Sequence, residues 1–150
     1  MGMSDKISQD LKSAMKAGDK LRVETLRTLR AALLEKDVEK RTAGGMKAED
    51  EIAALMSQAK KRKESIEIFR QNGRNDLADV EEKELGIIQE YLPKQLSAEE
   101  VEAAVKAVIA ETGAASATDF GKVMPAAMKV LKGKADGKLV QETVKRLLGN

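Results

Sequence analysis

The chain has 150 residues, with 27 lysines and arginines against 25 aspartates and glutamates, so its net charge is only +2. It contains no histidine, no cysteine and no tryptophan. These absences exclude disulfide frameworks, cysteine zinc sites and catalysis by imidazole or thiolate, such as the Ser-His-Asp triad. Catalysis would have to use carboxylates, lysines, hydroxyls or the single tyrosine, Tyr91. We therefore predict no catalytic residue, no metal ligand and no cofactor.

The sequence also carries no targeting signal of the secretory kind. Its first residues lack the apolar segment of a signal peptide, and no apolar run approaches the roughly 20 residues that span a bilayer. Together with the absence of cysteine, these features predict a cytoplasmic protein that makes no membrane contact.

Helical periodicity runs through the whole chain, and no segment alternates with the period of a strand. Four long helices are expected before Pro93. The first begins at Ser4, its N-cap, and ends near Gly18, and the fourth follows its N-cap Asn75. The second and third cover about 20–41 and 47–72.

Residues 92–96 form the expected boundary between two domains, 1–93 and 97–150. Ser97 and Glu100 then have the spacing of a capping box, with Leu96 and Val101 as its hydrophobic staple. The helix that they start should end at Gly113. After it we expect a short helix over 118–124, a helix that Pro125 starts and Gly133 ends, and a last helix over 136–148.

The third and fourth helices are expected to form a long antiparallel hairpin that turns at Gly73. Residues that face each other would then have numbers that sum to about 146, so that Ile66 meets Val80. The apolar stripes match except where Arg62 meets Glu84. We interpret Arg62 and Glu84 as a half-buried ion pair that sets the register of the two helices.

Charge is distributed unevenly in the last third of the chain: residues 97–119 carry a net charge of −4 and residues 120–150 one of +5. A basic stretch favours contact with a polyanion, because neutralised phosphates release counterions. The predicted phosphate contacts are Lys122, Lys129, Lys132, Lys134 and Lys138, with Lys145 and Arg146 as weaker candidates. The alternative is an exposed turn with ordinary surface lysines, where Asp136 caps the last helix and repels an anion. The basic run 60–63 fits a solvated helix surface better than a nucleic-acid patch.

Several stretches in combination resemble the GatB/YqeY family, in particular its free-standing YqeY-like proteins. They are residues 62–67, 73–78, 81–85, 91–96, 119–124, 133–137 and 144–145. This resemblance implies an all-α protein with an N-terminal multi-helical domain and a small C-terminal three-helix domain. Related sequence forms the tail of the B subunit of the tRNA-dependent amidotransferase, where it helps to hold the tRNA while other domains carry the chemistry.

The resemblance and the basic stretch together suggest an accessory module of translation that binds tRNA through its backbone, without catalysis of its own. Two alternatives stay open. One is a carbon–nitrogen ligase with glutamine as amide donor, which rests on family association alone. The other is a protein-interaction module that docks on a translation enzyme, such as the amidotransferase.

Overall fold

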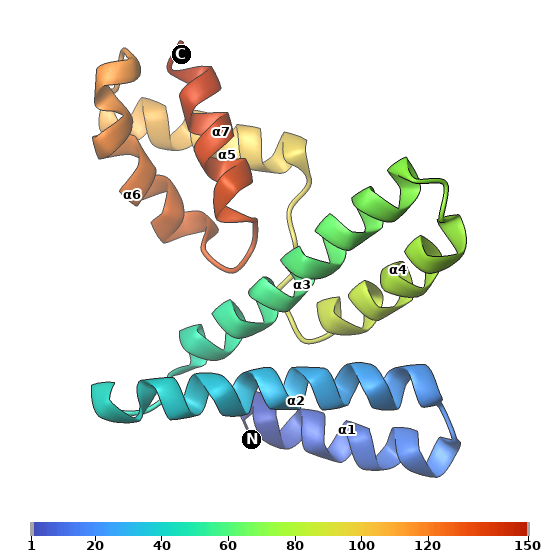
Figure 1. Cartoon of the computed structure of the whole chain (residues 1–150). Helices are drawn as coiled ribbons and strands as arrows, with labels where there is room; N and C mark the ends of the chain where they lie inside the picture. The colour runs from blue at the N-terminus through green and yellow to red at the C-terminus, as the bar shows by residue number, and fades with distance from the viewer. Residues whose placement is uncertain (1, 150) are drawn as a thin grey trace. The chain divides into compact units, whose positions relative to one another are not determined.

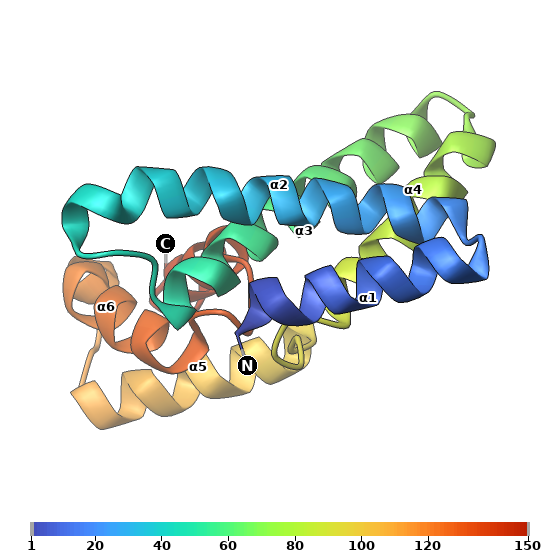
Figure 2. The ribbon, with the colours of Figure 1, turned by 90° about the horizontal axis from the view of Figure 1, so that it is seen from below.

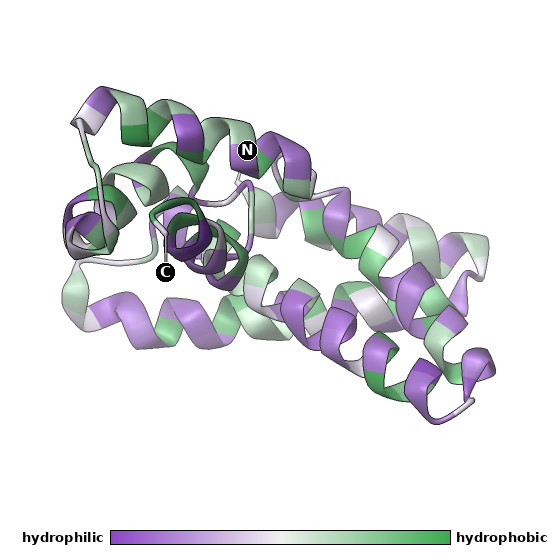
Figure 3. Cartoon of the chain, turned by 90° about the horizontal axis from the view of Figure 1, so that it is seen from above, coloured by the Kyte–Doolittle hydropathy of each residue, from purple (hydrophilic) through white to green (hydrophobic). Residues whose placement is uncertain are grey.

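The structure is a computed structural model that describes residues 2–149, and all secondary structure in this range is helical (Figure 1). The all-α class expected from the periodicity is thus confirmed. Hydrophobic and hydrophilic residues are interspersed along the helical ribbon (Figure 3), and hydrophobic residues supply the core of each unit. No helix in the described range is long and apolar enough to cross a membrane. The chain divides into two compact units, of which the first ends at Leu92 and the second begins at Pro93.

The N-terminal unit is built from two pairs of helices. It contains α1 (Met3–Ala17), α2 (Lys20–Lys40), the 3₁₀ helix η1 (Arg41–Ala43), α3 (Ala48–Gln71) and α4 (Asn75–Gln89). Helices α1 and α2 lie side by side, and α3 packs against α4 (Figures 1 and 2). The core is mainly aliphatic and includes Ile7, Leu11, Leu26, Leu29, Leu33, Leu55 and Ile88. Gly18 ends α1 in the left-handed conformation, with a φ of 71°, as its position predicts.

Two of the expected helix caps are wrong. Helix α1 begins one residue before Ser4, and its N-cap is Gly2 in an extended conformation, without a side-chain cap bond. Helix α4 begins at Asn75, so that its N-cap is Arg74. Asn75 Oδ1 instead accepts a hydrogen bond of 3.2 Å from Arg70 Nη1. The side chain of Asn75 is therefore engaged by Arg70 across the turn and does not cap α4.

Tyr91 closes the core at the end of α4. Its side chain is 8% exposed, and its hydroxyl donates a hydrogen bond to the carboxylate of Asp10 on α1. Burial and this neighbouring carboxylate raise the pKa of Tyr91 above its usual range. The ammonium group of Lys6 lies 5.4 Å from the centre of the ring. Tyr91 thus joins the last residues of the unit to its first helix.

Arg62 on α3 lies between two carboxylates of α4. Its Nε is 2.7 Å from Glu84 Oε2 and 3.5 Å from Glu81 Oε2. The three side chains retain only 17–24% of their exposure. Burial, followed by repulsion from Glu84, raises the pKa of Glu81. The site therefore contains one guanidinium and two partly desolvated carboxylates, and the sequence interpretation had missed Glu81.

The apolar face of α4 differs from the expected one. Val80, predicted to meet Ile66, is 43% exposed, whereas Ala78 is buried and Glu81 is half-buried. The face that α4 buries follows Ala78, Glu81 and Ile88 at helical spacing. Helix α4 packs against α2 as well as α3, so its inward face is turned toward both neighbours rather than toward α3 alone.

The C-terminal unit contains α5 (Ala98–Thr112), the 3₁₀ helix η2 (Ala117–Asp119), α6 (Phe120–Leu131) and α7 (Gly137–Leu147). Its core includes Val101, Val105, Val108, Val123, Ala127, Leu131, Val140 and Val144. The predicted capping box at the start of α5 is confirmed, because Ser97 and Glu100 exchange backbone-to-side-chain hydrogen bonds of 3.2 Å. Gly113 ends the helix with a φ of 70°, also as expected.

Pro125 does not start a helix. It lies inside α6, which runs without a break from Phe120 to Leu131. Proline lacks the N–H that would bond to the carbonyl four residues earlier, here Gly121 in the first turn. Gly121 is exposed, so water can satisfy that carbonyl. As the sixth residue of α6, Pro125 removes one hydrogen bond and crowds the carbonyl of Gly121, yet the helix continues through it.

Candidate nucleic-acid interface

The seven basic residues predicted to contact phosphate are all exposed and fall into two groups in the C-terminal unit. The first group surrounds the connection between α6 and α7. These turn lysines are Lys129, Lys132, Lys134 and Lys138. The second group lies near the start of α6 and the end of α7, which approach each other there. These end cations are Lys122, Lys145 and Arg146.

Two of the end cations have partners inside the unit. Arg146 Nη2 is 3.1 Å from Glu102 Oε2 on α5. Lys106 is 3.0 Å from the other oxygen of the same carboxylate, and these two cations, Lys106 foremost, lower the pKa of Glu102. The ammonium group of Lys145 lies 5.6 Å from the centre of the Phe120 ring, a cation–π distance. Arg146 and Lys145 are therefore already engaged in contacts within the protein.

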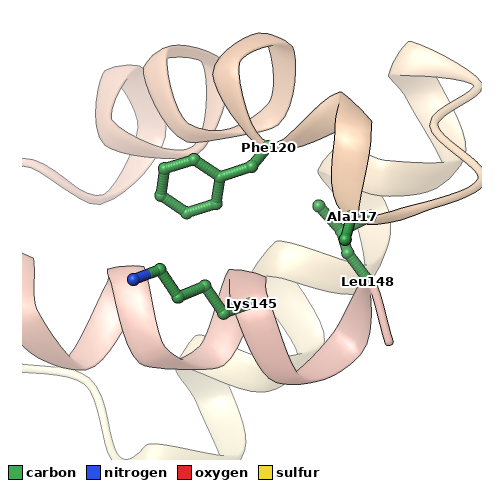
Figure 4. Close-up of a pocket in the computed structure, with 4 residues that line it drawn as sticks. All are labelled: Ala117, Phe120, Lys145 and Leu148. Atoms are coloured by element: carbon green, nitrogen blue, oxygen red, sulfur yellow. The ribbon is translucent and has the colours of Figure 1, made fainter. Parts of the chain in front are cut away.

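A pocket of about 310 Å³ lies beside these end cations (Figure 4). It is lined by Ala117, Phe120, Lys145 and Leu148, and the Phe120 ring faces the aliphatic chain of Lys145 across it. Three of its four lining side chains are apolar, and the fourth, Lys145, is the one cation among them. This end of the unit consequently does not continue the basic surface of the turn lysines.

Three of the turn lysines have unpaired ammonium groups. Among residues 2–149, Lys129, Lys134 and Lys138 form no ion pair. Lys129 belongs to the last turn of α6 and Lys138 to the first turn of α7, with Lys134 in the connection between them. Three positive charges thus stand within ten residues of chain, in full contact with water. Such a surface can bind a polyanion at little desolvation cost.

The connection that carries these lysines is held in place by the chain before α5. Gln95 Nε2 donates to the carbonyl of Gly133 at 2.9 Å, and the backbone N–H of Leu96 donates to the carbonyl of Lys134 at 2.9 Å. Gln95 is partly buried and also donates to the carbonyl of Pro93 at 2.8 Å. Gly133 has a φ of 81°, which favours glycine. Sequence reasoning had missed Gln95, because its partner lies 38 residues away.

Replacing Gln95 by Ala should weaken polyanion binding without removing a charge. The change deletes the hydrogen bond to Gly133 and frees the turn to move, so the three ammonium groups lose their fixed spacing. We expect tRNA affinity to fall by about two- to fivefold, measured by fluorescence anisotropy. The slope of affinity against salt should stay the same, because every cation is still present. A lowered slope would mean that Gln95 acts on the charges themselves.

The start of α7 is not a free anion site. Asp136 is the N-cap, and its Oδ1 accepts a hydrogen bond of 3.2 Å from the backbone N–H of Lys138. One of the N–H groups that a phosphate would use is therefore occupied by a carboxylate. The start of α7 therefore offers less to an anion than the exposed lysine side chains around it do.

An Asp136→Asn variant should bind tRNA more tightly than the natural chain. Asparagine caps helices about as well as aspartate, so α7 should keep its start, while one negative charge beside Lys138 disappears. We expect about a two- to threefold gain in affinity at low salt, which vanishes at high salt. An affinity that is unchanged at low salt would place the RNA contact elsewhere.

The carboxylates of residues 2–149 do not gather in groups of three that could hold a metal ion. The acidic residues of α4 pair with arginines of α3 instead. Arg62 forms ion pairs with Glu81 and Glu84, and Arg70 forms ion pairs with Asp79 and Glu82. These contacts join the two helices, so we read the acidic stretch of α4 as structural.

Comparison with known protein families shows to which family the chain belongs. The sequence model of the family described as Yqey-like protein matches residues 4–148. The chain belongs to the YqeY-like family. The matched range covers both structural units, and it includes all seven predicted phosphate contacts.

Curated relatives of this YqeY-like chain bear the name "Altered inheritance of mitochondria protein 41, mitochondrial". The one from Eremothecium gossypii is 36% identical over 109 residues, 70% of this chain and 58% of the relative. The one from Lachancea thermotolerans is 38% identical over 98 residues, 64% of this chain and 51% of the relative. For the one from Pyrenophora tritici-repentis the identity is 29% over 96% of this chain and 80% of the relative. The chain thus spans little more than half the length of the first two.

These relatives overturn the expectation of a cytoplasmic location, because each of them is named as a mitochondrial protein. The composition of the YqeY-like chain could not have distinguished the two compartments. A lack of cysteine excludes disulfides, but it does not separate one intracellular compartment from another. The lack of a secretory signal likewise says nothing about import into an organelle.

Proposed function

We propose that this YqeY-like chain is an accessory module that binds tRNA along its phosphate backbone at the turn lysines and catalyses no reaction of its own. In this proposal residues 97–150 form the three-helix part that contacts RNA, and residues 1–93 form a helical body. A translation enzyme of the amidotransferase type is the partner class that we propose for the RNA-bound module.

The observation that carries the proposal is the set of three unpaired ammonium groups on one braced connection. Lys129, Lys134 and Lys138 lack ion-pair partners among the described residues, and Gln95 holds the turn between them. Ordinary surface lysines are usually interspersed with carboxylates. Here the stretch 120–150 has seven basic residues and only two acidic ones.

The chemistry of this surface favours RNA backbone over bases. Lysine ammonium groups contact phosphates as point charges, whereas reading of single-stranded bases generally uses aromatic rings. The turn lysines have no aromatic neighbour in sequence, and the Phe120 ring belongs to the pocket at the end cations. We therefore expect binding that depends on the shape and charge of folded tRNA and little on its sequence.

An anisotropy titration of fluorescently labelled tRNA with the full chain, at 50 and 200 mM salt, tests the proposal. We expect saturable binding at the lower salt that weakens at the higher one, as counterion release requires. The same preparation is assayed for release of ammonia from glutamine, for which we expect no activity. Absence of binding at low salt would refute the RNA-binding role, and ammonia release would refute the absence of catalysis.

A further inference from the structure

Helix α2 carries aliphatic side chains on two faces, although only one of them reaches the core. The inner face buries Leu26, Leu29 and Leu33. On the outer face Leu34 and Val38 are 61% and 54% exposed. They lie four residues apart and so stand one above the other on the helix surface. Neither residue belongs to the core of the unit or to the partly buried side chains that pack against it.

Two unpaired guanidinium groups extend this outer face. Arg27 and Arg30 are exposed and form no ion pair among residues 2–149. The spacing 27, 30, 34, 38 keeps all four residues on one side of the helix. We call these four residues the outer stripe of α2. It combines two positive charges with two aliphatic side chains.

A pocket of about 290 Å³ continues the outer stripe toward the turn between α1 and α2. It is lined by Met15, Gly18, Lys20, Val23, Glu24 and Arg27. Met15 is 53% exposed, so the pocket has an apolar wall that is open to solvent, with two cations and one carboxylate around it. From Val23 to Leu34 and Val38 the distance along α2 is about 17–22 Å.

We propose that the outer stripe of α2 and this pocket form a docking surface for an acidic amphipathic helix of a partner protein. The occupant would place one apolar side chain in the pocket and two others against Leu34 and Val38, three to four turns away. Its carboxylates would face Arg27 and Arg30. Helix-in-groove recognition uses this combination of spaced apolar anchors and flanking charges.

Charge and apolar content argue against other occupants. A second copy of the chain, packed antiparallel in a symmetric contact, would set the guanidinium groups of one copy against the aliphatic pair of the other and leave them without a carboxylate partner from the stripe. RNA would pair with the guanidinium groups but would leave Leu34 and Val38 without an apolar partner. A lipid surface needs a helix face that is continuously apolar, whereas this stripe offers two aliphatic residues. The acidic helix satisfies both the charges and the aliphatic pair.

The probe for this surface is a fluorescein-labelled synthetic helical peptide of 18 residues. It carries leucines at positions 2, 13 and 17 (the spacing of the pocket and the aliphatic pair) and glutamates on the flanks. We expect saturable binding to the full chain by anisotropy, with amide shifts in α2 by NMR. A second peptide with lysine in place of each glutamate should not bind.

Two double variants test the two components of the surface. Arg27→Glu/Arg30→Glu and Leu34→Asp/Val38→Asp should each weaken peptide binding at least tenfold. The controls Lys60→Glu/Lys63→Glu, with the same spacing on α3, and Ile68→Asp, which changes an exposed aliphatic residue of α3, should change it less than twofold. The arginine variant should in turn bind the lysine peptide, which shows that it is folded.

Three results would overturn the proposal. The first is that the acidic peptide does not bind the natural chain. The second is that the control variants lose as much affinity as the variants of the outer stripe. The third is that tRNA or vesicles of anionic lipid, rather than the peptide, shift the amides of Arg27, Arg30 and Leu34. Because these tests concern α2, they succeed or fail separately from tRNA binding at the turn lysines.

Discussion

Replacing Lys129, Lys134 and Lys138 by Gln together should reduce tRNA affinity about 100-fold at 0.1 M salt and lower the slope of log affinity against log salt by about three. Each of these ammonium groups is unpaired among the described residues, so each is free to displace a counterion from a phosphate. Glutamine removes the charge, keeps most of the side-chain length and tolerates a helix. The measurement is an anisotropy titration at four salt concentrations.

A triple variant on α3 provides the matched control. Lys60, Lys61 and Lys63 are exposed and belong to the other basic run of the sequence. Changing these three to Gln alters the net charge of the chain by the same amount, yet we expect less than a threefold loss of affinity. If the α3 variant lost affinity and the turn variant did not, RNA would bind at the N-terminal unit and our assignment would be wrong.

Replacing Arg62 by Ala should lower the free energy of unfolding by about 2 kcal/mol. Loss of the guanidinium leaves Glu81 and Glu84 together, half-buried and uncompensated. Breaking a fully buried pair costs about 3–5 kcal/mol, and we reduce this figure because the side chains keep 17–24% of their exposure. Urea unfolding of the natural chain and the variant gives the difference.

Arg70 supplies a control with the same chemistry in a more exposed place. It also lies on α3 and pairs with two carboxylates of α4, Asp79 and Glu82, at 3.1 and 2.7 Å. Its side chain is 38% exposed, so water screens the pair and Arg70→Ala should cost much less than Arg62→Ala. Equal costs would show that partial burial does not distinguish the two sites.

A double-mutant cycle on Arg62 and Glu84 tests the predicted role of this pair in setting the helix register. Coupling near zero would reject it. Replacing Arg62, Glu81 and Glu84 together by aliphatic residues should recover most of the lost stability, because the desolvation cost then disappears. If the pair sets register, this triple variant should be stable and yet show heterogeneous α3–α4 packing by NMR.

The loss of unfolding free energy caused by Arg62→Ala should depend on pH. Burial already raises the pKa of Glu81, and loss of the guanidinium removes the charge that opposes this shift. A carboxyl whose pKa is higher in the folded state destabilises the fold when it is ionised, and the penalty is relieved as pH falls toward the unfolded value. The difference in unfolding free energy between natural chain and variant should therefore shrink from pH 7 to pH 5. A difference that grew toward pH 5 would contradict the assigned sign.

Local signals in the sequence predicted some helix ends correctly, although the N-caps expected at Ser4 and Asn75 were wrong. The capping box of Ser97 and Glu100 and the helix ends at Gly18 and Gly113 follow from side chains within a few residues of each other. Pro125 misled because proline was taken as a first-turn residue that starts a helix, whereas it is the sixth residue of a helix that continues through it. The wrong face of α4, with Val80 outside, arose because a pairwise hairpin register ignores packing against α2.

The site could be predicted only in part, for the same physical reason. The turn lysines lie within ten residues of one another in the sequence, so their common location required no knowledge of the fold. Gln95 and Glu81 act through partners that the tertiary structure brings near, and no local pattern marks them. The partners of Arg146 and Lys145, which draw these cations away from the candidate interface, likewise lie on other helices.

The most direct test of the RNA-binding account is an amide-shift map of the ¹⁵N-labelled full chain titrated with unlabelled tRNA at low salt. We expect perturbations concentrated at Lys129, Lys134, Lys138 and the residues that brace them, including Gln95, and few in α1 to α4. The perturbations should fade as salt is raised. A map centred on the N-terminal unit, or no perturbation at 50 mM salt, would contradict the account.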